Sequence, residues 1–405
     1  MASIYPFRAL RPVADKAPSV SSVPYDVVNT EEARQLAGND PLSFLHVTRS
    51  EIDLPADTDP YSPAVYERAK QNLQVLRDRA PLVMEDQPSL YFYRLRMGSH
   101  EQTGIAGCFS VDEYDADIIK KHERTRREKE DDRTRHIIGL RAQTGVVFLT
   151  YRAAAGVDAV ARRVTAAAPL YDFTAADGVR HTIWRVEADD TRALVEAFGR
   201  IPALYIADGH HRAASAARAR AELRSKGDAA EANTFIAVAF PDNQMQILPY
   251  NRIVKDLAGA TPDEFLAALR AQFPVAEGAP APRRKGEVAM YLGGRWYAID
   301  LGKAAPADRS RAAGLDVALL QAHVLERMLK IGDIRTDKRI DFIGGARGTK
   351  ALEEAVDSGR AAVAFSMFPV RVDDLLAISD TGGIMPPKST WFEPKLRDGL
   401  LVHLI

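Results

Sequence analysis

An apolar run that passes directly into a polar turn and then into an alanine-rich segment constrains the fold more than any other feature of this sequence. The run ALYIA (203–207) has the composition of a buried strand, and the turn DGHHR (208–212) follows it. A helical pattern covers 213–226, and the apolar run TFIAVAF (234–240) predicts a second strand. A strand–helix–strand unit of this kind favours a domain that mixes sheet and helix.

Similar alternation continues along the 405-residue chain, a length that suits two or three domains. The segment EGAPAPRRKGE (277–287) is rich in proline and basic residues and lacks periodicity, so we interpret it as a linker. It divides the chain into a core over 1–276 and a smaller α/β module over 287–405, and the fold class we expect is α+β with a mixed sheet. The other predicted elements are helices at 63–78, 156–168, 315–330 and 348–358, strands at 89–96, 104–110, 143–152, 181–187 and 361–367, and a hairpin at 288–301 with Gly293-Gly294 at its turn.

The composition excludes several classes of function. Hydrophobic residues make up 46% of the chain and charged residues 27%, as in globular proteins with a substantial core. The net charge of −1 argues against nucleic acid or an anionic membrane as a partner, and no stretch has the length of a membrane span. The single cysteine, Cys108, excludes an internal disulfide framework and a multi-cysteine zinc site. We therefore expect a cytoplasmic protein with a small-molecule substrate, with a homodimer as an option.

The DGHHR turn has the features of an anion-binding helix start. The first N–H groups of a helix lack intrahelical partners, and the helix dipole adds partial positive charge there. Gly209 allows a tight turn and a close approach to a ligand, and Arg212 adds a planar fork of donors for phosphate oxygens. Asp208, at the end of the strand, would hold Mg²⁺ or orient a hydroxyl. The alternative is that Asp208 caps the helix and that the side chains of His210 and His211 satisfy local hydrogen bonds.

The most charged segment of the chain, KKHERTRREKEDDRTRH (120–136), supplies further candidates. As a helix it would place His122 and Arg126 on one face, one turn apart. Glu123, beside many cations, would stay ionised and would accept a proton from a hydroxyl or bind a metal. The alternative is a solvated helix face with alternating charges. The functional interpretation depends on whether the fold brings this segment to the DGHHR turn.

Weaker candidates come from the N-terminal third and from the C-terminal part of the chain. Asp26 lies in the proline-bounded stretch VPYDVVN (23–29), where ordinary turn chemistry is an alternative. In SFLHVTRSE (43–51) the residues alternate, which predicts a strand with His46 on one face and Arg49 on the other, either lining a ligand or lying at an edge. The glycine pair of KRIDFIGGARG (338–348) favours a turn over a phosphate loop, and MPPKSTWFEPKL (385–396) favours a structural tail over a phosphate contact.

Taken together, these motifs resemble a known family. YPFRALRP, PYDVVN, HERT, ADGHHR, RIDFIGG and MPPKSTWFEPKL, in this order, are similar to a bacterial and archaeal family known as the domain of unknown function number 1015. The DGHHR element also resembles the turn that binds nucleotide phosphates in the ParB/sulfiredoxin superfamily, which includes free-serine kinases. The resemblance implies a ParB/sulfiredoxin-like core with an N-terminal elaboration and a smaller C-terminal module.

The same resemblance implies roles for individual residues. Gly209, His211 and Arg212, with His122 and Arg126, would contact the cofactor, which would be ATP or ADP with Mg²⁺. The catalytic residues would be Glu123, Asp208 and His210, with Asp208 as the metal ligand. Asp26, His46 and Arg49, which we single out from their local sequence patterns and not from the resemblance, would bind the substrate.

The function we predict is a nucleotide-dependent phosphotransferase that acts on the hydroxyl of a small metabolite such as serine. One alternative is a nucleotide-binding regulatory protein of the ParB type. The other is a metal-dependent hydrolase that uses Asp208, His210 and His122.

Overall fold

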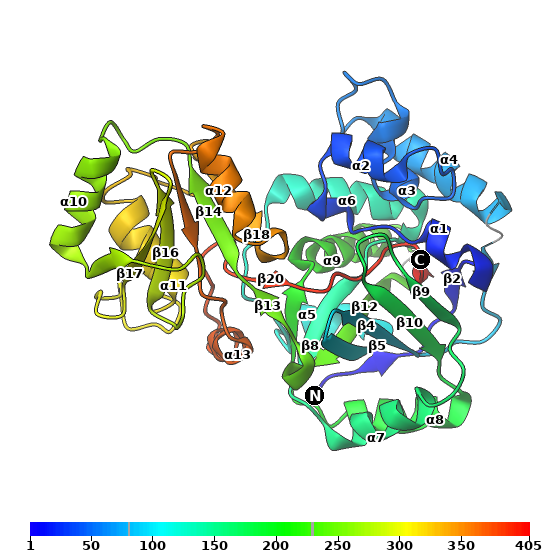
Figure 1. Cartoon of the computed structure of the whole chain (residues 1–405). Helices are drawn as coiled ribbons and strands as arrows, with labels where there is room; N and C mark the ends of the chain where they lie inside the picture. The colour runs from blue at the N-terminus through cyan, green and yellow to red at the C-terminus, as the bar shows by residue number, and fades with distance from the viewer. Residues whose placement is uncertain (80–81, 228–230) are drawn as a thin grey trace. The chain divides into compact units, whose positions relative to one another are not determined.

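The computed structural model describes residues 1–79, 82–227 and 231–405, and these fold into two compact units. Unit 1 contains Met1–Met245 and Pro394–Ile405, and unit 2 contains Gln246–Glu393 (Figure 1). The predicted linker at 277–287 lies inside unit 2. It joins β15 (Val275–Glu277) to β16 (Glu287–Leu292), and both of these strands pair with β17 (Arg295–Asp300). A basic, proline-rich stretch here connects two strands of one sheet instead of two domains.

Unit 1 is built on a large mixed sheet, which confirms the predicted α+β class with a mixed sheet. β8 pairs in parallel with β12 and antiparallel with β11, so the sheet has both kinds of ladder. The predicted strand pair at 89–96 and 104–110 is confirmed as the antiparallel strands β4 and β5. The strand order is β6 (Ile119–Lys120), β11 (Leu204–Asp208), β8 (Val147–Tyr151), β12 (Thr234–Pro241), β5 (His100–Ser110), β4 (Tyr91–Met97), β10 (Arg180–Arg185) and β9 (Tyr171–Thr174), with β1 (Ile4–Tyr5) paired to β5.

A smaller antiparallel sheet ties the C-terminus into unit 1. β21 (Val402–Leu404) pairs with β2 (Ala9–Arg11) and with β7 (Ala142–Gln143), and β2 also pairs with β3 (Val83–Met84). The α-helices of unit 1 are α1 (Ala17–Val20), α2 (Thr30–Ala37), α3 (Leu45–Thr48), α4 (Pro63–Arg79), α5 (Val111–Asp115), α6 (Arg127–Leu140), α7 (Ala155–Val164), α8 (Ala188–Phe198) and α9 (His210–Arg224).

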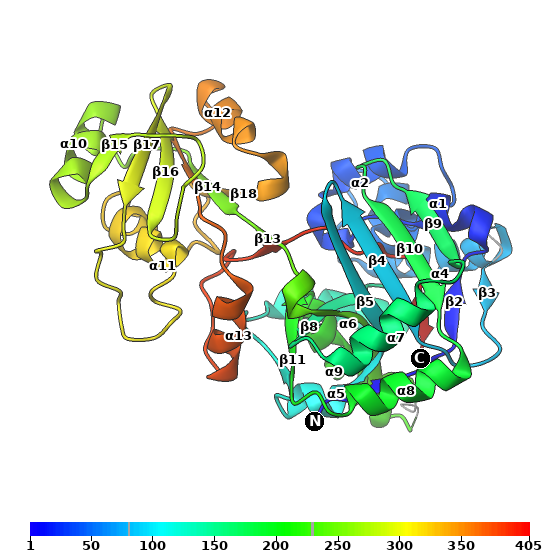
Figure 2. The same cartoon turned by 60° about the horizontal axis from the view of Figure 1, so that its bottom comes forward.

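The main core of unit 1 lies between the large sheet and its helices. α7 contributes Val157, Val160 and Val164, which recur at helical spacing, and it lies beside α8, which contributes Leu194 and Phe198 (Figures 1 and 2). Burial of each of these side chains stabilises the folded state by about 1.5–3 kcal/mol relative to leaving it exposed.

The helix α9 is buried on several sides, which explains its alanine-rich sequence. Ala213 and Ala216 face the sheet core, and α9 also packs against α5 and α6. Small side chains allow the helix to approach all three neighbours closely, where larger side chains would be too bulky. The start of α9 is therefore held in one position relative to β11.

Two local predictions were wrong in this unit. Residues 43–51 do not form a strand but form α3 and the 3₁₀ helix η3 (Ser50–Asp53). Helical geometry places Phe44 and Val47 together in one buried cluster, and Leu45 packs into another. In the segment 120–136 the helix begins only at Arg127, so His122 and Arg126 lie in the preceding loop and not on a helix face.

Unit 2 contains an antiparallel sheet with helices on its faces. The predicted hairpin is confirmed, with Gly293 and Gly294 at φ +57° and +78°, where glycine avoids the strain of a left-handed turn. The strand order is β15, β17, β16, β19 (Val363–Ser366), β14 (Tyr250–Val254) and β18 (Ile340–Gly344), and β13 (Ile247–Leu248) pairs with β20 (Trp391–Phe392). The helices are α10 (Pro262–Gln272), α11 (Asp316–Leu320), α12 (Lys350–Asp357) and α13 (Val372–Asp380).

The helix predicted at 315–330 is shorter than expected. α11 ends at Leu320 and continues as a π-helical turn, Gln321–Leu325. Both carboxylate oxygens of Asp316 accept the Gly286 N–H at 3.0 Å, so this side chain ties α11 to the start of β16 and does not cap the helix. No helix in the described ranges is long and apolar enough to span a lipid bilayer.

Candidate functional site

The turn between β11 and α9 is where distant stretches of the chain meet. It carries Asp208 at the end of β11 and Gly209 through Arg212 at the start of α9. The other stretches are the 3₁₀ helix η2 (Tyr25–Val27), the loop before α6, and the C-terminal segment of unit 1. The contacts are Arg212 Nη2 to Asp26 Oδ1 at 2.6 Å, Arg126 N to His211 Nε2 at 3.0 Å, Lys395 Nζ to Asp208 Oδ2 at 3.1 Å, and the rings of His122 and His210 with centroids 4.4 Å apart.

The amides at the start of α9 have no acceptor among the described residues, although Gly209, His210 and Arg212 are buried. Gly209 has φ +92°, and a Cβ there would lie 3.4 Å from Val147 Cα and 3.3 Å from Arg212 Cδ. Asp208 Oδ1 accepts the Gly209 N–H at 2.9 Å, and no side chain caps the helix, so the interpretation of Asp208 as a cap is wrong. In the part of the chain that the structure describes, no acceptor bonds the N–H groups of residues 210–212. Three amides therefore carry the partial positive charge of the helix start.

Asp208 and Lys395 form an ion pair at the edge of this turn. Their side chains are 29% and 14% exposed. Burial disfavours the charged carboxylate, but the charges of Lys395 and Arg212 outweigh that effect, and the pKa of Asp208 lies below its usual range. Asp208 is therefore an ionised hydrogen-bond acceptor at neutral pH.

His122 and His210 form a buried edge-to-face pair. Burial lowers the pKa of His122 to about 4, although the charge of Asp208 opposes the shift. Burial and the neighbouring His122 also lower the pKa of His210. Both rings are neutral at pH 7, and His122 Nδ1 has no hydrogen-bond partner among the residues that the structure describes.

The guanidinium of Arg212 is committed to the protein. It is 5% exposed, and its Nη1 donates to Val146 O at 2.7 Å while its Nη2 donates to Asp26. The Tyr25 ring lies under both Arg212, at 5.7 Å, and Arg133, at 4.3 Å. A cavity of about 20 Å³ beside Arg212 has room for one water-sized group. Arg212 thus fastens η2 to the start of α9 through both of its terminal nitrogens, while its buried Nε has no hydrogen-bond partner among the described residues.

A residue that the sequence analysis did not single out, Asp398, lies behind Arg212. Its carboxyl is 1% exposed, and neither oxygen has a hydrogen-bond partner in the described ranges. Burial raises its pKa to about 7, with Arg212 opposing the shift and Asp26 adding to it. No local pattern in the sequence indicates such a group, because its burial depends on the packing of the C-terminal segment.

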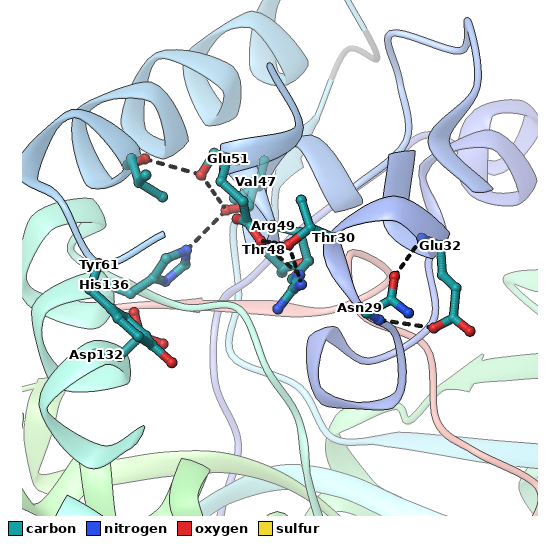
Figure 3. A network of polar contacts seen from close by, with 12 residues as sticks. Asn29, Thr30, Glu32, Val47, Thr48, Arg49, Glu51, Tyr61, Asp132 and His136 are labelled. Atoms are coloured by element: carbon teal, nitrogen blue, oxygen red, sulfur yellow. Dashed lines mark hydrogen bonds and ion pairs between the residues drawn. The ribbon is translucent and has the colours of Figure 1, made fainter. Parts of the chain in front are cut away.

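The predicted substrate residues His46 and Arg49 bind within the N-terminal helices. His46 Nδ1 contacts Asp53 Oδ1 at 2.7 Å. Arg49 contacts Thr30 Oγ1 at 3.1 Å and Glu51 Oε1 at 3.0 Å (Figure 3). The same group of helices is held to α6 by a hydrogen bond from His136 Nε2 to Val47 O (Figure 3). These contacts do not link His46 or Arg49 to the DGHHR turn, and their substrate role stays a prediction.

The other predicted residues divide into contacting and neighbouring groups. Asp26, His122 and Arg126 contact the turn directly, although Arg126 does so through its backbone N–H while its side chain is exposed. Glu123 is half-buried and adjoins His122 in the same loop. Lys395 lies in the segment that the sequence analysis interpreted as a structural tail. Only the motif MPPKSTWFEPKL pointed to this stretch.

The side chains at this site do not fit a preformed metal centre. Within residues 1–79, 82–227 and 231–405, no three His, Cys, Asp or Glu side chains are grouped as metal ligands. Asp208 is the predicted Mg²⁺ ligand, but its carboxylate already faces the Lys395 ammonium. The assignment of Mg²⁺ to Asp208 stays a prediction, and we derive no chemistry from it.

Comparison with known proteins confirms the resemblance noted in the motifs. A family described as "Protein of unknown function (DUF1015)" matches residues 4–318. No protein of curated function matches the sequence.

Several solved structures share low similarity with the chain, and three of them are compared with it. They are a conserved hypothetical protein from Pyrococcus furiosus (15% identity, TM-score 0.36, 74% of this chain and 95% of that one), a free serine kinase in complex with AMP (13%, 0.36, 73% and 91%), and C-terminally truncated SbnI from Staphylococcus aureus (13%, 0.39, 74% and 87%). Similarity at this level does not establish a shared activity.

Proposed function

The chain belongs to the DUF1015 family of proteins of unknown function, so its activity has to be argued from its own site, and we propose that it is a nucleotide-dependent phosphotransferase. The substrate would be a small hydroxyl-bearing metabolite such as serine, and the phosphate donor ATP or ADP. The observation that carries the proposal is the start of α9, where the amides of residues 210–212 lack acceptors in the described part of the chain, next to the Asp208–Lys395 pair.

The start of α9 would bind phosphate through its backbone. Three N–H groups and the helix dipole favour an anion. The Lys395 ammonium adds a full positive charge at the same end of β11. Phosphoryl transfer needs mainly positioning and charge stabilisation, which these groups supply.

The side chains around the amides would have separate roles. Arg212 would be a positioning residue, because it holds Asp26 and Val146 O instead of facing solvent. Asp208, kept ionised by its cationic neighbours, would accept a hydrogen bond from the substrate hydroxyl. Glu123 would be the other candidate for the substrate proton, because it lies one residue from the buried His122. A ParB/sulfiredoxin-like core belongs to the same proposal, since that fold places a helix start against a sheet end.

The direct test uses the full chain with ATP or ADP, with and without Mg²⁺, and with serine and a panel of other hydroxyl compounds. Mass spectrometry of the small molecules would detect the phosphorylated product. We expect Lys395→Ala to lower kcat/KM about 100-fold, because the substitution removes one cation at the site of transfer. Lys70→Ala, at an exposed position on α4, is the control and should leave the activity unchanged. Absence of product with every donor would overturn the proposal.

The ion pair itself favours a second candidate. Because Lys395 occupies one oxygen of Asp208, the site offers phosphate binding more readily than a free acid for proton transfer. A nucleotide-binding regulatory protein needs phosphate binding but no free acid for proton transfer. Tight nucleotide binding that Lys395→Ala weakens, without any product, would favour this candidate over the phosphotransferase.

A further inference from the structure

Unit 2 contains a buried arginine that has no acidic partner. Arg252 lies on the inner strand β14, between β18 and β19, and is 1% exposed. Its Nη1 donates to Tyr250 O and its Nη2 donates to Lys388 O at 3.0 Å, and within the described ranges no carboxylate forms an ion pair with it. Burial lowers its pKa to about 10, so it stays charged at neutral pH. A buried charge without a counter-charge is costly and calls for an explanation.

The loop that Arg252 holds brings a second cation to the same place. Lys388 has φ +58°, a left-handed conformation that is unfavourable for a side-chain-bearing residue. A hydrogen bond from Ser389 Oγ to Pro386 O, at 2.6 Å, joins the two sides of this loop. The Lys388 ammonium lies 5.3 Å from the centre of the Tyr250 ring. Arg252 and Lys388 thus bring two positive charges to Tyr250, one through its carbonyl oxygen and the other through its ring.

Aromatic rings form a platform beside these cations. The Tyr250 ring contacts Trp391 at 5.0 Å and Phe342 at 5.8 Å, and all three rings are partly exposed. A Cβ at Gly344 would lie 2.6 Å from the Trp391 ring, so the first glycine of RIDFIGG allows this ring to pack on β18. The two motifs that the sequence analysis interpreted as a turn and a tail therefore meet at Arg252.

We infer that the loop around Lys388, supported from below by Arg252, is an anion-binding site of unit 2, and that its ligand is a phosphate-class dianion. Lys388 would contact the anion directly. Arg252 would act from the interior, by fixing the Lys388 carbonyl and by adding a charge that the low-dielectric surroundings screen weakly. Two positive charges match a doubly charged anion better than a single carboxylate. Every residue named for this site belongs to unit 2, whereas the residues at the start of α9 belong to unit 1.

The test is a titration of the full chain with inorganic phosphate at low ionic strength, followed by tryptophan fluorescence. Trp391 is one of three tryptophans and packs on Tyr250, so we expect a saturable signal that Trp391→Phe removes. Lys388→Ala should weaken the binding about tenfold, which corresponds to the loss of one charge-assisted contact. Lys350→Ala, whose side chain is 84% exposed on α12, is the matched control and should bind as the wild type does.

Two further variants separate the two sites and the role of Arg252. Lys395→Ala should leave the Trp391 fluorescence signal intact even if it abolishes nucleotide binding or phosphoryl transfer at the start of α9. Arg252→Met should weaken binding as well, and if that variant does not fold, Lys388→Ala alone decides. The absence of a saturable signal in the wild type, or equal binding by Lys388→Ala and Lys350→Ala, would overturn the inference.

Discussion

The ammonium of Lys395 lies 3.1 Å from Asp208 Oδ2, although 187 residues separate the two in sequence. The contact fixes the segment that returns to unit 1 against the end of β11. It also sets the charge of the turn, because Asp208 would otherwise be a half-buried carboxylate beside two neutral histidines. Loss of Lys395 should therefore affect both stability and binding.

We expect Lys395→Met to lower the free energy of unfolding at pH 7 by about 1–3 kcal/mol, because it leaves a largely buried carboxylate without its cation. Urea denaturation of Lys395→Met, of Asp208→Asn and of the double variant forms a double-mutant cycle. The double variant should recover part of the loss. Additive effects of the two substitutions would show that the ion pair contributes nothing.

Asp398 should make the protein less stable as the pH rises. The pKa of this carboxyl is about 7 in the folded chain, compared with an ordinary value of 3.8 that applies to the unfolded chain. Folding therefore favours the protonated form. The contribution is fully present below pH 4 and is lost as the pH rises through about 7. Asp398→Asn should therefore be more stable than the wild type at pH 8, by about 2–4 kcal/mol, and equally stable near pH 4.

The measurement for Asp398 is urea denaturation between pH 4 and pH 8. Asp189→Asn, whose side chain is 89% exposed, is the control and should show no pH-dependent gain. If Asp398→Asn were less stable than the wild type at pH 8, the carboxylate would be ionised and paired with Arg212 instead.

Most local elements of this fold follow from sequence patterns. Prediction fails where one pattern suits both a strand and a helix. The strand–helix–strand unit around DGHHR and the Gly-Gly hairpin were predictable because period, composition and turn chemistry agree there. The segment 43–51 was mispredicted because Leu45 and Val47 have the spacing of one face of a strand, whereas Phe44 and Val47 have the spacing of one face of a helix and are buried in one cluster. Only the surrounding helices decide between the two.

The site was predictable only as far as its local motifs reach. DGHHR and HERT were recognised as candidates, and the fold brings His122 to His210 and Arg126 to His211. An arginine fork binds phosphate and carboxylate equally well, so the sequence could not indicate that Arg212 pairs with Asp26. Contacts such as Lys395 to Asp208, and the burial of Asp398, depend on the path of the whole chain.

The role of Arg212 can be tested by a substitution that keeps its charge. Arg212→Lys lacks the planar fork with which the guanidinium donates to Asp26 and Val146 O, so we expect it to destabilise the protein by about 2 kcal/mol. If Arg212 is the positioning residue that we propose, nucleotide affinity should fall less in Arg212→Lys than in Lys395→Ala. Calorimetric titration with ADP measures the difference. A larger loss of affinity in Arg212→Lys would mean that the guanidinium contacts the phosphate.

Gly209 should be required for its backbone conformation and for the space above it. At φ +92° an alanine is strained by about 1–2 kcal/mol, and its Cβ would also approach Val147 Cα and Arg212 Cδ. Gly178 offers a matched control, since it has φ +81° but nothing within 4 Å of an added Cβ. Backbone strain should lower the unfolding free energy by a similar amount in Gly209→Ala and in Gly178→Ala. Crowding should lower it further in Gly209→Ala. Only Gly209→Ala should weaken ADP binding, because its methyl group would press on Val147 and Arg212 and so shift the start of α9. Equal ADP affinity in the two variants would place the nucleotide elsewhere.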